Sequence, residues 1–338
     1  MKKNLIFSLV LFLGITQLAK AQTGQSAYEF LRLPTSTHVS ALGGTNISLV
    51  NDDNSMAFQN PALLSRIPEK SISLNYMNYV ADINYGTAFF SMSASKRAVV
   101  GIGMVYMDYG SFRATTSDNT TYGTFAAKDM ALHLTYSYRL TDTWSGGFTG
   151  KAIYSVFEDY SSMALGVDLG LNYFNPNENI SVSIALKNLG DQLKDYNDVY
   201  EKLPWDLQFG VSKKLAHAPF RIHLTGKYLN VWDLSLLRET LSTDGSGTIR
   251  SSDTFFTTLT KHMGFGLDFL FTKNFYLALG YNPKVADDFK VLEQKGFYGF
   301  TSGIGFDIKR YHIGATVFQQ HVGGTSLMIG VSTDLKKL

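Results

Sequence analysis

From residue 71 onward the chain alternates apolar residues with small or polar ones, and the pattern returns in segment after segment. In residues 128–140, every second residue from Met130 to Leu140 is Met, Leu or Tyr, and alanine or a polar residue stands between each pair. Residues 163–173 repeat the pattern. A period of two is typical of β-strands with two unlike faces. The sequence therefore predicts an all-β fold.

Fourteen segments show this alternation. They cover about 71–79, 83–95, 98–108, 128–140, 143–157, 160–174, 179–189, 204–214, 219–232, 261–272, 274–282, 297–309, 310–319 and 325–335. An even number of strands is a property of single-chain bacterial outer-membrane barrels. Between these strands, no stretch reaches the ~18 apolar residues of a spanning helix, so only a closed barrel could cross a membrane.

The lengths of the connections support the same fold. The short ones are 96–97, 141–142, 175–178, 215–218, 273 and the junction at 310, and the long ones are 109–127, 190–203, 233–260 and 283–296. The long ones all fall at one end of the strands, as in outer-membrane barrels. We predict a 14-stranded antiparallel transmembrane β-barrel over residues 71–338, with the long loops facing the cell exterior. A soluble periplasmic all-β protein is the alternative.

The N-terminus has the features of an export signal. A basic start at Lys2 and Lys3 precedes a mostly apolar run over 5–18, and Ala19 and Ala21 are small residues suited to cleavage. We predict a signal peptide at 1–21 and a location in the outer membrane of a Gram-negative bacterium. A membrane anchor is the alternative, although the run is short for it. The absence of cysteine excludes a lipid-bearing thiol and disulfides.

Charge and motifs give no indication of chemistry. Without Lys2, Lys3 and Lys20, 27 basic residues face 28 acidic ones, a balance that predicts no nucleic-acid partner. The chain has no phosphate-binding loop and no zinc-binding histidine pair. His133 with Ser137 could be nominated as a hydrolase pair, and the Asp52 and Asp287 regions as calcium ligands. Chance spacing and solvated carboxylates explain these better, so we predict no enzyme, no cofactor and no metal.

Residues 22–70 do not follow the strand pattern. We expect them to fill the barrel as a plug or to cap its periplasmic side. Two short motifs in this segment have a local structural explanation. Gly43-Gly44 permits positive φ, and Asn60-Pro61 favours a turn or a helix start. The plug motif comprises Leu42, Gly43, Gly44, Asn60, Pro61 and Ala62.

The same segment carries a family resemblance. Residues 28–34 (YEFLRLP), 41–49 (ALGGTNISL) and 59–64 (QNPALL) resemble the PorV/PorQ group of type IX secretion proteins, within the wider family of FadL-like fourteen-stranded barrels. The chain length and residues 30–34 look more like PorQ-type members than the longer PorV-type ones. The match covers residues 25–64, and the barrel only through strand number and size. The chain departs from common barrels by lacking a terminal aromatic residue.

This resemblance, and not the composition, implies a role. It implies a non-catalytic component of the type IX secretion attachment complex, which holds a PorZ-like surface protein beside a PorU-like sortase and a PorV-like barrel. Lipid and lipopolysaccharide would surround it.

Two functions are therefore open. As a scaffold, the protein would have an occluded lumen and would dock a surface partner through aromatic residues of its long loops. These are Tyr109, Phe112, Tyr122, Phe125, Tyr196, Tyr200, Phe255, Phe256 and Phe289. As a FadL-type transporter of hydrophobic small molecules, it would have an apolar lumen pocket and a lateral opening in the barrel wall.

Overall fold

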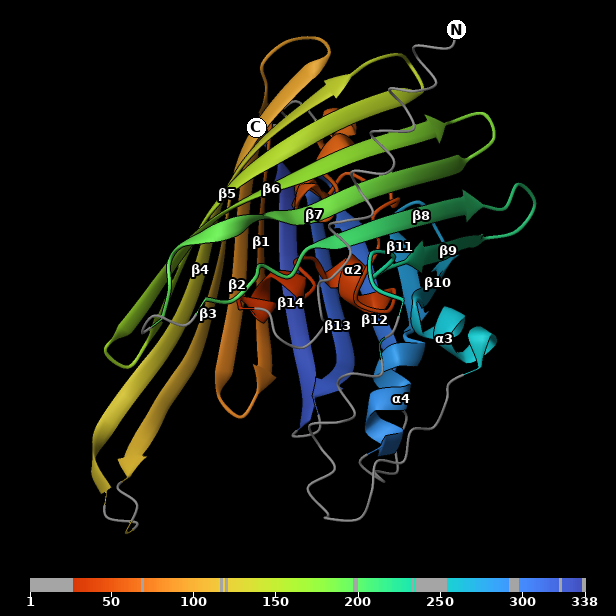
Figure 1. Ribbon diagram of the computed structural model, residues 1–338. Helices are drawn as coiled ribbons and strands as arrows, with labels where there is room; N and C mark the ends of the chain where they lie inside the picture. The colour runs from red at the N-terminus through yellow and green to blue at the C-terminus, as the bar shows by residue number, and fades with distance from the viewer. Residues whose placement is uncertain are drawn as a thin grey trace, which may run out of the picture.

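The chain forms a closed antiparallel barrel in which each strand pairs with its sequence neighbours and β1 pairs with β14 (Figure 1). The computed structural model describes residues 27–67, 70–115, 118, 121–196, 200–232, 234, 254–291, 298–321 and 324–335. The strands are β1 (Lys70–Val80), β2 (Ile83–Ser93), β3 (Ala98–Thr115), β4 (Thr121–Arg139), β5 (Trp144–Phe157), β6 (Tyr160–Asn175), β7 (Ile180–Lys194), β8 (Asp206–Lys214), β9 (Phe220–Gly226), β10 (Met263–Leu270), β11 (Phe275–Tyr281), β12 (Phe300–Ile308), β13 (Tyr311–His321) and β14 (Gly324–Asp334). The prediction of a fourteen-stranded antiparallel barrel is confirmed.

The two faces of each strand differ as the alternation predicted. On β4, Leu132 and Leu134 point outward and are 43% and 57% exposed, whereas Ala131 and Ser137 point into the lumen and are fully buried. Because hydrocarbon offers no hydrogen bonds, the outward apolar face suits lipid, and the closed ladder pairs the backbone.

Two long loops were predicted wrongly. Strands β3 and β4 continue into the range 109–127, so Tyr109, Phe112, Tyr122 and Phe125 lie in strands and not in a loop. The reason is a register shift at Gly110, whose φ of +78° marks a bulge that breaks the alternation. In the second case, much of the predicted loop 283–296 is the helix α4 (Pro283–Val291).

Other strand boundaries also differ from the predicted ones. Strand β7 extends to Lys194, and β9 ends at Gly226, six residues earlier than expected. The long connection after β9 contains the helix α3 (Phe255–Lys261). The predicted signal peptide at 1–21 and residues 235–253 of the 233–260 loop lie outside the described residues.

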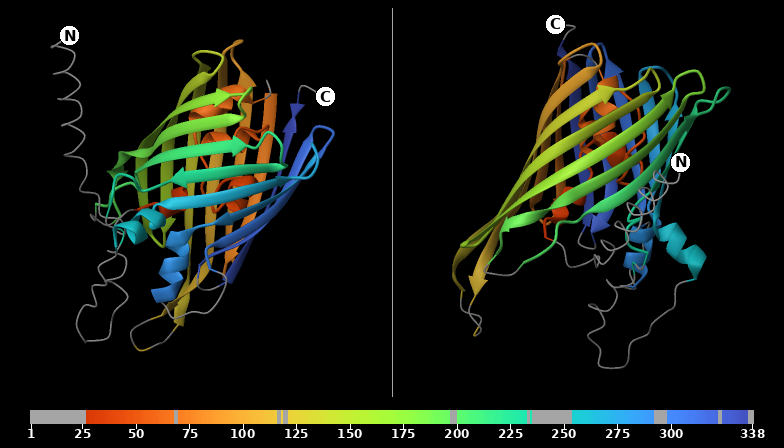
Figure 2. Two further views of the ribbon diagram at one scale, coloured as in Figure 1. Left: turned by 90° about the vertical axis from the view of Figure 1, so that its right-hand side faces the viewer. Right: turned by 45° about the horizontal axis from the view of Figure 1, so that its top comes forward.

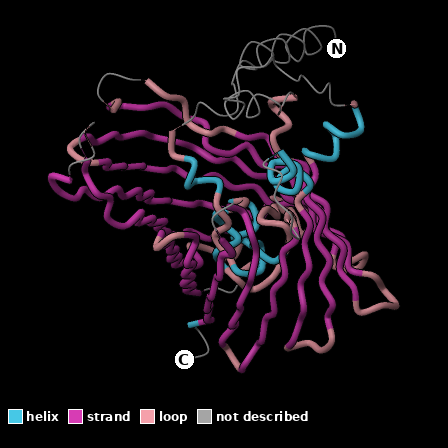
Figure 3. The backbone as a smooth tube through the Cα atoms, turned by 90° about the horizontal axis from the view of Figure 1, so that it is seen from below, coloured by secondary structure: helices cyan, strands magenta, loops and turns pink. Residues whose placement is uncertain are grey.

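Residues 27–67 lie inside the barrel (Figures 2 and 3). They contain short helices η1 (Glu29–Arg32), α2 (Thr37–Ala41), η2 (Asn54–Phe58) and η3 (Pro61–Arg66). The Ala27 amide donates to the Lys202 carbonyl at 3.0 Å, at the end of the barrel with the long connections, which we call the long-loop end. Arg66 Nη2 donates to the Thr143 carbonyl at 2.5 Å, in a turn at the opposite, short-turn end. This segment, which we call the plug, therefore crosses the lumen.

Among the described residues, no helix combines the length and the hydropathy needed to cross a membrane.

The outward face gives a first prediction. Leu134→Arg places a charge within the lipid-facing apolar band, which costs about 2–4 kcal/mol near the bilayer midplane and about 0–1 near its edges. We expect Leu134→Arg to lower the unfolding free energy by the larger of these two amounts, as measured by urea titration of the protein in lipid vesicles. Leu193→Arg is the matched control, because Leu193 lies near the end of β7 and is 66% exposed. Equal losses in the two variants would contradict the placement of lipid against β4.

Candidate functional site

Glycines on the lumen face of the wall make room for the plug. A Cβ added at Gly170 would lie 1.9 Å from Asn60 Oδ1, and one at Gly280 would lie 2.1 Å from the amide nitrogen of Gly43. A Cβ at Gly147 would lie 2.6 Å from the carbonyl carbon of Pro61. Such distances exclude a side chain at these positions unless the backbone moves. Wall and plug are therefore shaped to each other.

The plug motif has a structural explanation in its own backbone. Gly43 and Gly44 adopt φ of +90° and +83°, a region that other residues seldom occupy. Asn60 caps η3, because its Oδ1 accepts from the Ala62 amide at 3.0 Å while Pro61 starts the helix. Leu42 is buried against the position of Gly266 on β10. These residues hold the plug in shape and in contact with the wall.

A buried charge cluster ties the plug to β9 and β10. Asp268 Oδ1 lies 2.9 Å from His38 Nε2 of the plug, and Asp268 Oδ2 lies 2.6 Å from Arg221 Nη2 and 3.1 Å from His223 Nε2. The His38 ring also stacks on Tyr276, with the ring centroids 4.0 Å apart. Removing one member of a buried ion pair typically costs about 3–5 kcal/mol. We call this cluster the polar anchor.

The wall from β5 to β9 carries further polar contacts. Lys151 Nζ lies 2.7 Å from Asp168 Oδ2 and donates to Asn188 Oδ1 at 2.5 Å. Beyond the end of β9, burial lowers the pKa of Lys227 to about 8. This side of the lumen therefore resembles the polar interior usual for membrane barrels.

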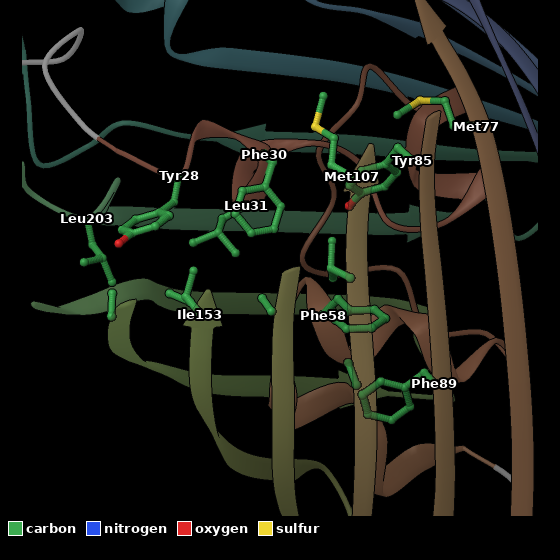
Figure 4. Packing of buried hydrophobic residues seen from close by; sticks show 14 of the residues in the cluster. Tyr28, Phe30, Leu31, Phe58, Met77, Tyr85, Phe89, Met107, Ile153 and Leu203 are labelled. Carbon is green, nitrogen blue, oxygen red and sulfur yellow. The ribbon is translucent and has the colours of Figure 1, made fainter. Parts of the chain in front are cut away.

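The lumen face of β3 is different, because it is apolar, and scattered inward residues of its neighbours add to it. Between Val99 and Met107, the inward residues of β3 are valine, methionine or glycine. Figure 4 shows Phe30, Leu31 and Phe58 of the plug among the wall side chains. The wall members of this apolar cluster include Met77, Tyr85, Phe89, Val99, Val105, Met107, Ala131, Ile153, Ala164, Phe318 and Met328. The cluster runs along β3 from the long-loop end toward the short-turn end.

A cavity of about 500 Å³ opens at the long-loop end of β3 to β6. We call it the mouth pocket. Its lining consists of Tyr109, Phe112, Ala127, Asp129, Ser155, Val156, Phe157, Tyr160, Tyr196 and Glu201. Tyr109 Oη donates to Asp129 Oδ2 at 2.7 Å, and the Ser155 hydroxyl donates to Asp129 Oδ1. Met107 and Ile153 of the apolar cluster are each two residues from a lining residue of the same strand, so pocket and cluster adjoin.

The residues predicted to dock a partner do not form one surface. Tyr109, Phe112 and Tyr196 line the mouth pocket, and Phe125 stacks on Phe112 at 5.3 Å. The side chain of Tyr122 lies outside the described residues.

The remaining predicted docking residues lie elsewhere. Tyr200 is exposed and donates to Asp191 Oδ1 at 2.6 Å. Phe255 and Phe256, on α3, are 61% and 73% exposed. Phe289 is buried and stacks on Tyr298, because α4 turns it inward; its part in docking a partner stays a prediction.

The nominated hydrolase pair does not form. Ser137 Oγ donates to the Ala62 carbonyl at 3.2 Å, and neither ring nitrogen of His133 has a hydrogen-bond partner in the described part of the chain. The His133 ring instead contacts the edge of Phe58. Asp53 caps η2 by accepting from the Ser55 amide at 3.0 Å. Across the described ranges, no cluster of three acidic or histidine residues could hold a metal.

Sequence reasoning missed the mouth pocket and the polar anchor. Asp129 met Tyr109 only because β3 and β4 continued past the predicted loop boundary. His38 and Asp268 are 230 residues apart, and no local signal joins them.

Comparisons of structure identify the type of barrel. No family model and no curated protein sequence matches the chain. The toluene transporter TodX of Pseudomonas putida is similar with a TM-score of 0.58 and 12% identity, over 90% of this chain and 98% of that one. A FadL homologue of Pseudomonas aeruginosa (TM-score 0.52, 12% identity, 89% and 98% covered) and the monoaromatic hydrocarbon channel CymD (0.52, 11%, 89% and 96%) are also similar.

At such low identity the likeness shows the fold alone. The chain has the FadL-like fourteen-stranded fold of outer-membrane barrels, and this level of the predicted resemblance is confirmed. Its structural neighbours are transporters and channels.

The fit of plug to wall gives a second prediction. Gly280→Val forces a side chain against the Gly43 backbone, and overpacking of this kind costs typically about 1–3 kcal/mol. The loss is expected in the unfolding free energy in lipid vesicles. Gly150→Val is the matched control, because nothing lies within 4 Å of a Cβ there. If both variants were as stable as the parent, the plug would not pack as described.

Proposed function

We propose that the protein is an outer-membrane transporter of hydrophobic small molecules. The observation that carries this proposal is the apolar cluster along the lumen face of β3, which continues from the mouth pocket and packs against apolar residues of the plug. A water-filled pore has a polar interior, so an apolar lumen wall favours an apolar guest. The fold of TodX and CymD, whose names refer to toluene and monoaromatic hydrocarbons, supports the same class of substrate. The long loops then face the cell exterior.

The plug would act as the gate. Its contacts along β3 are apolar, through Phe30, Leu31 and Phe58, and a hydrophobic guest can replace these contacts without leaving a polar group unpaired. Hydrogen bonds such as that from Asn54 Nδ2 to the Ser71 carbonyl, at 2.9 Å, hold the plug to the neighbouring strands. Its contacts with β9 and β10 include the polar anchor, where separation would leave a buried charge without its ionic partner. The plug therefore yields on its apolar side and stays attached on the other.

A lateral exit is best placed at the seam between β7 and β8. Their ladder ends at the pair Lys187 and Asp206, although β7 continues to pair with β6 as far as Lys194. Side-chain bonds cover this seam, since Asn188 Nδ2 donates to the Pro204 carbonyl at 3.0 Å. Asn188 has a positive φ of 56°, which marks a bulge in β7. The ladder of β7 with β8 is therefore shorter than the ladder of β7 with β6, and its open end leaves part of β7 without a backbone partner on the β8 side.

The attachment scaffold is the second candidate. One feature supports it: Phe255 and Phe256 of α3 are exposed beside Trp232, as aromatic anchors of an interface would be. The resemblance of residues 25–64 to the PorV/PorQ group points the same way. Recovery of a PorZ-like protein with the tagged barrel from solubilised membranes, lost in Phe256→Ser, would favour this role.

Transport gives the third prediction. Ala131→Phe adds a ring to the apolar lumen wall, whereas Ala152→Phe adds the same ring to the outward face of the adjoining strand. The added ring should obstruct the apolar path and slow uptake by Ala131→Phe about tenfold, which corresponds to about 1.4 kcal/mol. Uptake of radiolabelled toluene by intact cells that express each variant measures this, with gel mobility before and after heating as the check of folding.

Ala152→Phe should leave uptake unchanged. Cells that take up toluene equally fast with and without the parent protein would refute the transporter.

A further inference from the structure

Asp129 is a buried carboxylate without a cationic partner. It is 8% exposed, and its two oxygens accept from the hydroxyls of Tyr109 and Ser155. Within the described ranges, no lysine, arginine or histidine nitrogen lies within 4.0 Å of it. Aspartate is rarely buried unless it is paired.

Two other buried lumen carboxylates do have partners. Asp168 faces Lys151 at 2.7 Å, and Asp268 faces Arg221 at 2.6 Å. All three aspartates point inward from strands of the same barrel. Of these three, only Asp129, which lines the mouth pocket, lacks such a cation in the described ranges. Asp206 of β8 also lacks one, but it does not line this pocket and accepts from the Tyr228 amide and Gln208 Nε2.

A second carboxylate faces the same cavity. Glu201 lines the mouth pocket, and its backbone is held in place because its amide donates to Gln192 Oε1 at 2.7 Å. The lining contains two acidic side chains and no basic one. Burial, with the nearby carboxylates of Asp129 and Glu201, raises the pKa of Tyr196 to about 12. The pocket thus has a negative electrostatic potential.

Aromatic residues make up half of the pocket lining. Tyr109, Phe112, Phe157, Tyr160 and Tyr196 contribute five rings. The faces of aromatic rings carry partial negative charge and attract cations, and groups of such rings recognise quaternary ammonium ligands. A volume of about 500 Å³ accommodates a small molecule of drug-like size.

We infer that the mouth pocket binds small organic ammonium ions, with an apolar body against the five rings and the cationic nitrogen toward Asp129 and Glu201, and that it disfavours carboxylates. This inference rests on the proposed function and narrows its substrate class. The cationic nitrogen of the ligand would pair with Asp129, which has no cationic partner among the described residues.

Three probes that share a phenylethyl group test this inference. They are (2-phenylethyl)trimethylammonium, its uncharged isostere (3,3-dimethylbutyl)benzene, and 3-phenylpropanoate. Each is equilibrated by dialysis against the full chain in phosphatidylcholine nanodiscs, with empty nanodiscs as the blank. We expect the ammonium to bind at least about tenfold more tightly than the isostere, a difference of about 1.4 kcal/mol, and the carboxylate to bind most weakly.

Variants assign the effect to the two carboxylates. Asp129→Asn and Glu201→Gln should each reduce the preference for the ammonium, whereas Glu178→Gln, in a short turn at the opposite end, should not. Glu201 lies in the connection between β7 and β8 and not in a strand of the wall. The Glu201→Gln variant therefore remains informative if Asp129→Asn fails to fold.

The outcomes separate the two proposals. If the isostere binds as tightly as the ammonium, or if the preference survives both variants, the ammonium inference is wrong and the hydrophobic transporter stands. If none of the probes binds above the blank and toluene uptake is also absent, both proposals fail.

Discussion

The structure depends on one constraint: in hydrocarbon, each backbone N–H and C=O must find a partner within the protein. Where the described ranges contain no long apolar helix, a chain meets this constraint only by closing a sheet on itself, and the pairing of β1 with β14 closes it here. Closure then imposes a division on every strand, because alternate side chains must face lipid and lumen. The outward Leu132 and Leu134 of β4 and its buried, inward Ala131 and Ser137 follow directly.

The two sides of the lumen hold the plug by different kinds of contact. Glycines such as Gly170 and Gly280 admit the plug, and the anchor of His38, Arg221 and Asp268 fixes it on one side. On the other side the plug packs against the apolar cluster along β3, where contacts are dispersive, while hydrogen bonds such as Asn54 Nδ2 to the Ser71 carbonyl tie it to neighbouring strands. In the proposed transporter, a hydrophobic guest would enter at this apolar cluster while the polar anchor keeps the plug attached.

Much of the fold could be predicted because strand alternation is a local signal. It failed at Gly110, where a bulge shifts the period, and the strand beyond it was therefore read as a loop. The candidate site was harder, because its contacts are not local: Asp129 meets Ser155 through the register of β4 and β5, and His38 meets Asp268 across the lumen. Burial of Phe289 likewise depends on the helix α4, which the sequence reading placed in a loop.

The most direct test of the account is a spin-label scan of β4 in lipid vesicles. The chain has no cysteine, so single cysteines placed from residue 130 to 138 can each carry one nitroxide. Even-numbered positions should show high accessibility to dissolved oxygen, which concentrates in the bilayer, and odd-numbered positions should be shielded from it by the plug and lumen. A scan without this two-residue alternation, or with its phase reversed, would contradict the assignment of faces on which the lumen, the plug and the mouth pocket all depend.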